Sequence, residues 1–230
     1  MNPVFGAIDL GEVEVEGRFV DASNATLFAH CSLGEFKVPV IYKPIAGERP
    51  LWDFPDGNLA NRELAAYLLS EALALHIVPY TIVREGPFGP GMVQEWIEIV
   101  EDFDVVSLGQ SREERIRKMA LFDAIINNTD RKYGHILPGP NGEIFGCDHG
   151  VTFHVDPKLR TVIWQFAGDP FSAEEIAILG EGLEISREIL EGLITPLEIE
   201  ALLKRISILI ADGAFPFPSE DWPSIPWPPF

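Results

Sequence analysis

The sequence predicts an α+β protein in which a β-rich amino-terminal half is followed by a helix-rich carboxy-terminal half. Apolar and polar residues alternate over the first 45 residues, with turn residues between the runs. Helical periodicity dominates from Ser111 onward, and a single helical segment precedes it. A chain of 230 residues can bury a core as one large domain or as two small lobes. The change of pattern near the middle of the chain favours two compact lobes.

The amino-terminal half is expected to form an antiparallel meander, one helix and a hairpin. The third strand must end at Pro44, because proline has no amide hydrogen to donate to a neighbouring strand. The helix follows an irregular loop and Asn58, and it places Leu64 and Leu68 on one apolar face. The segments, in order, are the strands VEVEGRFV, ATLFAHC and FKVPVIYK, the helix LANRELAAYLLSEALAL, and the strands PYTIVRE and MVQEWIEI around the turn GPFGPG.

The carboxy-terminal half is expected to be mainly helical. Its first helix, SREERIRKMALFDAII, begins with Ser111 and Glu114 at the spacing of a capping box. A short hairpin turns at Asn141-Gly142, and LRTVIWQF is a possible third strand after it. Helical periodicity then predicts helices near 172–180, 184–194 and 196–212.

The end of the sequence, FPFPSEDWPSIPWPPF, contains too many prolines for a helix or a central strand. Its aromatic residues favour an extended strap packed on the body over a proline-motif ligand for another protein. We therefore divide the chain into an amino-terminal lobe at 1–100, a carboxy-terminal lobe at 101–213 and a packed tail at 214–230.

The charge and the cysteines limit the partners and the compartment. A formal net charge of −19, spread over both halves, disfavours nucleic acid and anionic membrane surfaces, although anionic small molecules remain possible beside a metal ion. Cys31 and Cys147 lie far apart in apolar or strand-like surroundings, which favours two reduced thiols and a cytoplasmic location. No stretch approaches the roughly 18 apolar residues of a spanning helix, and no export signal is expected at the start.

The densest group of chemically capable residues lies in NNTDRKYGHILPGPNGEIFGCDHG, at 127–150. Asp130 is followed five residues later by His135, and Asp148-His149-Gly150 comes just beyond the hairpin. This order matches the protein-kinase catalytic loop H-R-D-L-x-x-x-N followed by D-F-G. There, one aspartate faces the attacking hydroxyl, while the +5 side chain and the later aspartate hold the magnesium ions that bridge the phosphates. The pattern therefore predicts phosphoryl-transfer chemistry.

Two earlier residues fit the same chemistry, which also needs a strand lysine that binds phosphate and a helix glutamate that orients this lysine. Lys43 ends a predicted strand, and Glu63 lies in the first turns of the next helix. Taken alone, Lys43 is a solvated surface lysine and Glu63 is a first-turn residue favoured by the helix dipole. Their order ahead of Asp130, His135 and Asp148 favours the functional interpretation.

At this level of detail the sequence resembles the actinobacterial branch of the phosphatidylinositol 3/4-kinase-like family and, more distantly, the HipA-type kinases. The resemblance extends over nearly the whole chain and implies a two-lobed protein-kinase-like fold. It rests on the segments ASNATL, VIYKPIAGERPLWDFPDG, NRELAAYLLSEAL, GPGMVQEWIE, LFDAIINNTDRKYGHIL, DHGVTFH, KLRTVIW and IPWPPF.

The resemblance also implies roles for individual side chains. Lys43 would bind the phosphates of ATP, and Glu63 would pair with Lys43. Asp130 would be the catalytic-loop aspartate, and His135 and Asp148 would hold Mg²⁺ or Mn²⁺. At the +5 position histidine replaces asparagine, and its nitrogen suits manganese or zinc at least as well as magnesium.

Nucleotide contacts are also expected from two backbone segments. By the resemblance, Gln94, Glu95, Trp96 and Ile97 form the hinge that reads adenine through its backbone. No G-x-G-x-x-G occurs in the first hairpin, and the hydroxyls, amide and backbone N–H groups of its turn are expected to cover the phosphates instead. The residues of that turn are Ser23, Asn24, Ala25 and Thr26. After Gly150 there is no room for a long activation loop and no A-P-E, so ordinary peptide docking is not expected.

The same residues have ordinary structural interpretations. Asp130 can cap a turn, Asn127 and Asn128 can end the preceding helix, and Asp148 can be a strand-end aspartate. The neighbouring basic residues form three pairs. His149 and His154 are expected to be packing or surface residues, and Lys158 and Arg160 either form a charged turn or meet a phosphate-bearing substrate. Arg131 and Lys132 are either ordinary surface residues, or one of them stabilises the transferring phosphoryl group.

Three functions follow from these patterns. The leading hypothesis is an ATP-dependent phosphotransferase that uses Mg²⁺ or Mn²⁺ and transfers the γ-phosphoryl group to a protein, a lipid head group or a small metabolite. The net charge of −19 weighs against a membrane phosphoinositide. The second hypothesis is a catalytically inactive, nucleotide-binding pseudokinase. The third is a metal-dependent phosphohydrolase built on Asp130, His135, Asp148 and His149, which leaves the lysine and the glutamate without a role.

Overall fold

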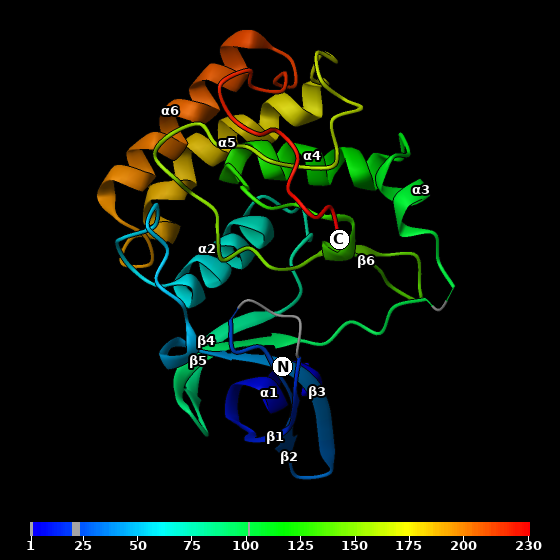
Figure 1. Ribbon diagram of the computed structural model, residues 1–230, viewed down its shortest axis with the longest axis vertical. Coiled ribbons are helices and arrows are strands. Elements are labelled where there is room, and N and C mark those ends of the chain that lie inside the picture. Colours follow the sequence, from blue (N-terminus) through cyan, green and yellow to red (C-terminus); the bar gives the residue numbers. More distant parts are fainter. Residues whose placement is uncertain (1, 20–23, 101) are drawn as a thin grey trace.

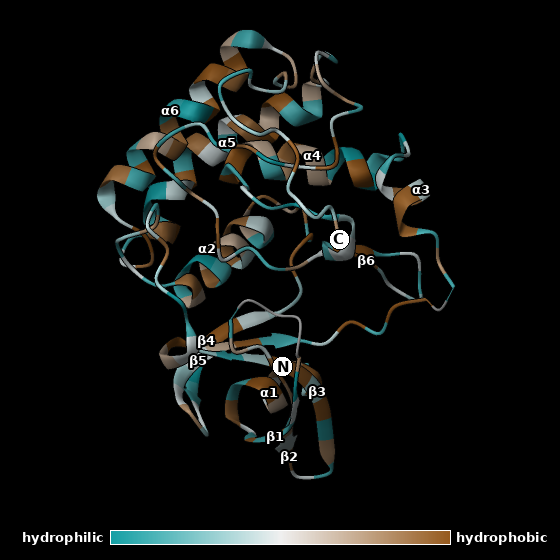
Figure 2. Cartoon of the chain, viewed as in Figure 1, coloured by the Kyte–Doolittle hydropathy of each residue, from teal (hydrophilic) through white to brown (hydrophobic). Residues whose placement is uncertain are grey.

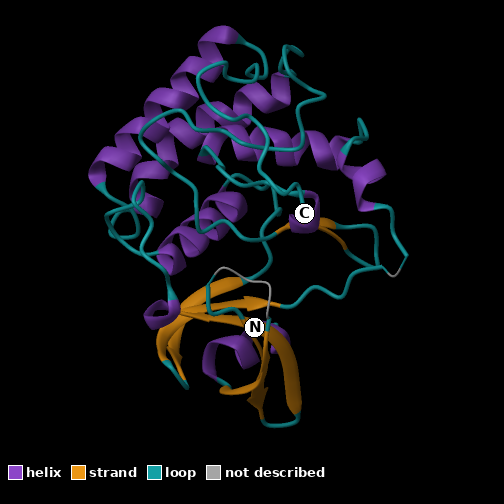
Figure 3. Ribbon diagram, in the orientation of Figure 1, coloured by secondary structure: helices purple, strands orange, loops and turns teal. Residues whose placement is uncertain are grey.

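The computed structural model describes residues 2–19, 24–100 and 102–230, which form a sheet and a larger helical body (Figure 1). The strands gather at one end of the molecule and most of the helices at the other, as Figure 3 shows. This arrangement confirms the expected α+β class with a β-rich lobe and a helix-rich lobe. No helix within the described ranges is both long enough and apolar enough to cross a membrane.

The smaller lobe is a five-stranded antiparallel sheet with strand order β1-β2-β3-β5-β4. The first three strands pair in the expected meander, and β4 and β5 pair as the expected hairpin. Strand β3 joins the two units by pairing with β5, with Lys43 opposite Met92. Val20, the end of the first predicted strand, lies outside the described residues. The strands are β1 (Glu12–Arg18), β2 (Leu27–Leu33), β3 (Phe36–Pro44), β4 (Thr81–Gly86) and β5 (Gly89–Glu95).

The two faces of this sheet have different neighbours. Helix α1 (Pro3–Leu10), which the sequence interpretation did not anticipate, packs on one face in an apolar cluster. Ala29 of β2 and Val40 of β3 belong to this cluster. Since side chains alternate along a strand, Phe28 and Lys43 point to the opposite face, toward the helical lobe.

Helix α2 (Leu59–Ala72) begins after the loop that follows β3 and lies between the sheet and the helical lobe (Figure 1). Its Ala65 and Leu69 are fully buried in the large apolar cluster of the helical lobe. On the same face of the helix, the buried Arg62 pairs with Glu198 of α6 at 2.6 Å. Helix α2 is therefore packed as a part of the larger lobe. The expected lobe boundary at residue 100 stays a prediction.

Three long helices form the body of the larger lobe. Helix α5 is continuous where two helices were predicted at 172–180 and 184–194. Helices α5 and α6 both begin with a reciprocal capping box, which satisfies two amide donors at each start. In Figure 2 hydrophobic and hydrophilic residues alternate along both helices, as expected when one face of a helix is buried. The helices of this lobe are α3 (Val105–Gly109), α4 (Glu114–Ile126), α5 (Ala173–Leu190) and α6 (Pro196–Asp212).

The capping box predicted at the start of α4 is absent. The helix begins at Glu114, its N-cap residue is Glu113, and no side chain accepts a capping hydrogen bond there. Ser111 instead accepts a hydrogen bond from the Glu113 amide at 3.3 Å. The reason is that α3 ends only at Gly109, so that Ser111 belongs to the short connection between α3 and α4.

The strand predicted at 159–166 does not form. Only an isolated bridge between Arg131 and Thr161 is present, because the segment pairs with the short irregular loop after α4 and not with the hairpin. The hairpin itself forms as expected, with β6 (Ile136–Pro138) paired to β7 (Ile144–Gly146). Both cysteines are free thiols, as expected.

The proline-rich tail lies in an extended conformation on the helical lobe. The Ser224 carbonyl accepts a hydrogen bond from the Thr161 amide at 3.0 Å, and the Pro229 carbonyl accepts one from the Tyr133 amide at 2.9 Å. These contacts are those of a strap on the body of the molecule.

Candidate active site

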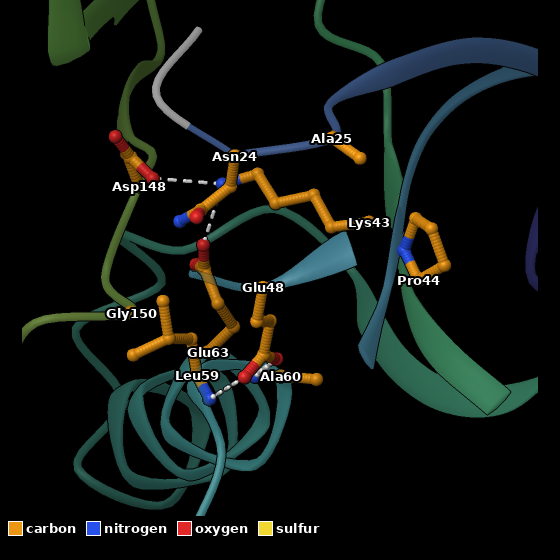
Figure 4. Close-up of a pocket in the computed structure, with 10 residues that line it drawn as sticks. All are labelled: Asn24, Ala25, Lys43, Pro44, Glu48, Leu59, Ala60, Glu63, Asp148 and Gly150. Carbon is orange, nitrogen blue, oxygen red and sulfur yellow. Dashed lines mark hydrogen bonds and ion pairs between the residues drawn. The ribbon is translucent and has the colours of Figure 1, made fainter. Parts of the chain in front are cut away.

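Three charged side chains from distant parts of the sequence meet between the two lobes (Figure 4). Lys43 extends from the end of β3, Glu63 from the second turn of α2, and Asp148 from the chain just after β7. The Lys43 Nζ lies 2.7 Å from the Glu63 Oε1 and 2.7 Å from the Asp148 Oδ1. The structure thus brings together the lysine, the helix glutamate and the later aspartate of the predicted site.

The backbone around Asp148 explains how one glutamate serves two segments. Asp148 has φ of +60°, a left-handed conformation that is uncommon for a residue with a side chain. The next amide, that of His149, donates to the Glu63 Oε2 at 2.9 Å. Glu63 therefore holds both the lysine and the turn that carries Asp148. Gly150 allows this approach, because a Cβ there would lie only 3.2 Å from the Cβ of Leu59.

The charges of the site fix the protonation states of its members. Burial lowers the pKa of Lys43, but the adjacent carboxylates of Asp148 and Glu63 outweigh this effect and raise the pKa above its ordinary value. The Lys43 charge holds the pKa of Asp148 well below its usual range. Burial lowers the pKa of His135, so that its imidazole is neutral near pH 7. An ionised carboxylate and a neutral imidazole are the forms that bind metal ions.

A pocket opens beside these three residues. Its cavity volume is about 20 Å³, room for about one water molecule, and it lies between the sheet, the start of α2 and the segment after β7 (Figure 4). Asn24 and Ala25 of the predicted phosphate-covering turn line it together with Lys43. Thr26 is not one of the lining residues, and Ser23 lies outside the described residues.

Sequence reasoning missed one acidic residue of this pocket. Both carboxylate oxygens of Glu48 accept hydrogen bonds at the start of α2, from the Leu59 and Ala60 amides at 2.9 Å each. An acidic residue at a helix N-terminus is stabilised by the helix dipole and by the free amides there. No spacing rule signals it, because Glu48 is eleven and twelve residues away from its partners.

The catalytic-loop candidates lie near the same site. The Asp130 carboxylate pairs with Lys132 at 3.1 Å and is part-exposed. The His135 Nε2 lies 3.5 Å from the Asp148 Oδ2, so that these two predicted metal ligands are neighbours. Within the described chain no group of three or more His, Cys, Asp or Glu side chains is gathered to hold a metal ion. A metal here would need oxygens from a ligand, as kinase metal ions take from phosphates.

The predicted hinge begins with a buried residue. Gln94 belongs to β5 and is directed toward the α2 side of the sheet, where its amide donates to the Thr81 hydroxyl at 2.9 Å. The amides of Glu95 and Trp96 donate to the carbonyls of Tyr80 and Pro39. Strand β5 ends at Glu95, before the predicted strand end, and in the described chain the Ile97 amide makes no backbone hydrogen bond.

Arg131 does not face the site. It is fully buried and pairs with Asp123 of α4 at 2.9 Å, and its guanidinium lies 2.7 Å from the His149 Nε2. The suggestion that Arg131 stabilises a transferring phosphoryl group is therefore wrong, because its charge is already paired in the interior. His149 is a packing residue, as expected, and Lys132 keeps its place beside Asp130.

Lys158 is not part of a solvated turn. It is buried, its Nζ lies 3.3 Å from Asp53, and it lies over the rings of Trp52 and Trp222 at 5.2 and 4.9 Å from their centroids. The partners come from distant segments, which is why a local reading of the sequence could not find them. Asn127, by contrast, ends α4 in the left-handed conformation of a C-cap, as its ordinary interpretation expected.

The fold of this protein is kinase-like. It is similar to the Helicobacter pylori proinflammatory kinase CtkA, with a TM-score of 0.52 and 10% identity, covering 90% of this chain and 94% of that one. It is also similar to the Golgi casein kinase, with a TM-score of 0.52 and 11% identity, covering 92% of this chain and 73% of that one.

A relative with much higher sequence identity defines the family of this chain. The chain is 41% identical over 259 residues to Protein Rv2133c of Mycobacterium tuberculosis (strain ATCC 25618 / H37Rv), covering 96% of this chain and 93% of the relative. The chain belongs to the family of this protein. No family model matches the chain. The finer resemblance to the phosphatidylinositol 3/4-kinase-like branch stays a prediction.

Proposed function

We propose that the protein is an ATP-dependent phosphotransferase of atypical kinase type. The observation that carries this proposal is the junction of Lys43 with Glu63 and Asp148, 2.7 Å on each side, at a pocket between a five-stranded sheet and a helical lobe. In kinases a strand lysine paired to a helix glutamate must stand beside the metal-binding aspartate before phosphoryl transfer can proceed. A solvated surface lysine would not be expected to pair with two acidic side chains from segments 20 and 105 residues away in the sequence.

Phosphate binding would use the positive charge of Lys43 and the turn at Asn24 and Ala25. Asp148 and His135 would hold a divalent ion, Mg²⁺ or Mn²⁺, because one is ionised and the other neutral near pH 7. The ion would supply charge neutralisation for the phosphates. The residues fit such a group, since the His135 Nε2 and the Asp148 Oδ2 already lie 3.5 Å apart.

Adenine recognition would use the chain just after β5. The Ile97 amide is free of backbone partners in the described chain and can donate to a base. Phe28 of β2, which β3 separates from β5, packs edge-to-face against Trp96, with ring centroids 5.3 Å apart. Phe28 is on the same face of the sheet as Lys43, so a nucleotide that reaches the lysine can stack its base beside these rings.

The acceptor would approach Asp130. This carboxylate is part-exposed and pairs with Lys132, which places one acid and one cation together at the predicted catalytic loop. Asp130 would orient or deprotonate the acceptor hydroxyl, and Lys132 would offset charge on the transferring group.

The test is calorimetric titration with ATP in the presence of Mg²⁺ or Mn²⁺, followed by a transfer assay with labelled ATP. Lys43→Met and Asp148→Asn should remove measurable affinity, whereas Asp130→Asn should retain affinity and lose transfer. Lys37→Met is the matched control, because Lys37 is on the same strand but half-exposed and paired with Glu16. If the wild-type protein has no affinity for ATP with either metal, the proposal fails.

One observation favours a pseudokinase as the second candidate. Lys43 already bonds directly to the Asp148 Oδ1, so a metal and a phosphate must compete with this ion pair. ATP affinity without transfer to any acceptor, and without self-modification, would select that candidate. The phosphohydrolase has no such support, because His149 is buried against Arg131 and no three-ligand group is present in the described chain.

A further inference from the structure

The loop that carries Asp130 contains one short 3-10 helix, Tyr133–His135, and otherwise depends on hydrogen bonds to other segments. The Arg160 amide donates to the Asn128 carbonyl at 2.9 Å, and the Arg131 amide donates to the Arg160 carbonyl at 3.0 Å. A third bond joins the Val162 amide to the Arg131 carbonyl at 3.1 Å. Asp130 thus lies between Asn128 and Arg131, which both form backbone hydrogen bonds with the segment 158–164. We call this segment the second row, because it runs beside the loop that carries Asp130.

The tail lies beside the second row and forms hydrogen bonds with it. The Ser224 carbonyl accepts hydrogen bonds from the Thr161 amide at 3.0 Å and from the Trp164 Nε1 at 2.8 Å. Further along, the Pro229 carbonyl accepts a hydrogen bond from the Tyr133 amide at 2.9 Å. Tyr133 lies between Asp130 and His135 in the sequence, so the tail bonds to the predicted catalytic loop directly as well as through the second row.

One tail side chain anchors this arrangement. The Trp222 ring lies over two cations of the second row, 4.9 Å from the Lys158 Nζ and 5.9 Å from the Arg160 Cζ. Cation–π contacts of this kind contribute about 0.5–2 kcal/mol each, more when the cation is desolvated. Lys158 is buried, so its contact is of the stronger kind. Trp227, in the same tail, is 85% exposed.

We propose that Trp222 is a positioning residue for phosphoryl transfer. It fixes the tail on the segment 158–164 and thereby holds the loop from Asn128 to His135 in place. This inference rests on the proposed function of Asp130 and His135. In the described chain none of the tail's hydrogen bonds goes to Lys43, Glu63 or the hinge, so the tail acts on transfer and not on nucleotide binding.

The experiment compares Trp222→Ala with the matched control Trp227→Ala and the conservative variant Trp222→Phe. Hydrogen exchange followed by mass spectrometry measures how strongly the backbone amides are protected in peptides that contain residues 128–135 and 158–164. Exchange in both peptides should accelerate at least about tenfold in Trp222→Ala, and it should be near wild type in the other two variants. The transfer rate constant kcat should fall about tenfold in Trp222→Ala, with the Kd of ATP within about twofold of wild type.

Equal exchange in Trp222→Ala and Trp227→Ala would overturn the inference. So would a loss of ATP affinity as large as the loss of kcat, because a general loss of structure would affect both lobes. If Trp222→Ala does not fold, Trp222→Leu replaces it with the same expected and contrary outcomes. Absence of ATP affinity in the wild-type protein would contradict only the proposed function. The exchange comparison would still test whether Trp222 protects the loop, because it requires no turnover.

Discussion

Replacing Lys43 by methionine should destabilise the folded protein measurably, whatever the chemistry of the site. The Glu63 side chain is 2% exposed, and its two partners are Lys43 at 2.7 Å and the His149 amide at 2.9 Å. Lys43→Met leaves a buried carboxylate with only the amide. Breaking a buried ion pair in this way costs about 3–5 kcal/mol. Because Lys43 is 19% exposed and Asp148 is 51% exposed, we expect the lower end, about 3 kcal/mol.

A second substitution separates buried charge from lost packing. Glu63→Gln in the Lys43→Met background replaces the unpaired carboxylate by a neutral amide of the same shape. The double variant should therefore be more stable than Lys43→Met by about 1–2 kcal/mol, although Glu63→Gln alone is destabilising. Lys37→Met, on the same strand but half-exposed, should change stability by no more than about 0.5 kcal/mol.

The assay is urea denaturation followed by circular dichroism, with thermal melting as a second measure. For a chain of 230 residues, about 3 kcal/mol corresponds to a fall in Tm of about 6–12 °C. Simple additivity of the two single substitutions would refute the reasoning, because it would mean that Glu63 does not depend on Lys43. A loss for Lys37→Met as large as that for Lys43→Met would refute it as well.

Three further predictions concern other charged groups. Burial and the adjacent charge of Arg131 hold the pKa of His149 well below its ordinary value of 6.5, so below pH 6.5 the unfolded chain binds more protons and stability should fall as the pH falls, by up to about 1.4 kcal/mol per pH unit. Urea midpoints between pH 7 and 5 measure this slope, and His149→Asn should reduce it; an unchanged slope would show that other groups cause it. Arg62→Met should cost about 3–5 kcal/mol, because it leaves Glu198 buried without its partner at 2.6 Å, whereas Arg187→Met, which breaks an exposed pair with Glu200, should cost less than about 1 kcal/mol. Equal losses in thermal melts would contradict the difference in burial. His135→Asn replaces a nitrogen ligand by a carbonyl oxygen and should shift metal-dependent ATP affinity from Mn²⁺ toward Mg²⁺, measured as the ratio of the two Kd values; an unchanged ratio would mean that His135 does not touch the metal.

The sequence predicted those parts of the fold whose signals are local. The meander, the β4–β5 hairpin and α2 have strong periodicity bounded by prolines, glycines and an N-cap asparagine, so their positions follow from short windows. Helix α1 was missed because it has only eight residues, and its start depends on a single hydrogen bond from the Val4 amide to the Asn2 side chain. The predicted strand at 159–166 failed for a related reason, since its apolar pattern reflects burial between the loop that carries Asp130 and the tail.

The candidate site divides in the same way. The order of Lys43, Glu63 and Asp148 in the sequence led to residues that the structure places in direct contact. Residues outside this ordered motif, whose partners come from distant segments, could not be assigned correctly. Lys158 reads as part of a charged turn but is buried between two tryptophans, and Arg131 reads as an accessible cation but is neutralised by Asp123 in the interior.

The packing of α2 also determines what can move. Since α2 shares a core with α5 and α6, a rotation of the five-stranded sheet that carries β3 away from the helical lobe also carries β3 away from α2. The contact between Lys43 and Glu63 spans the separation between β3 and α2, so the distance between these two side chains reports how far the two lobes have moved apart. A pair of fluorophores, one on the β2–β3 turn and one on α5, would follow this opening as ATP is added, with no need to know the acceptor.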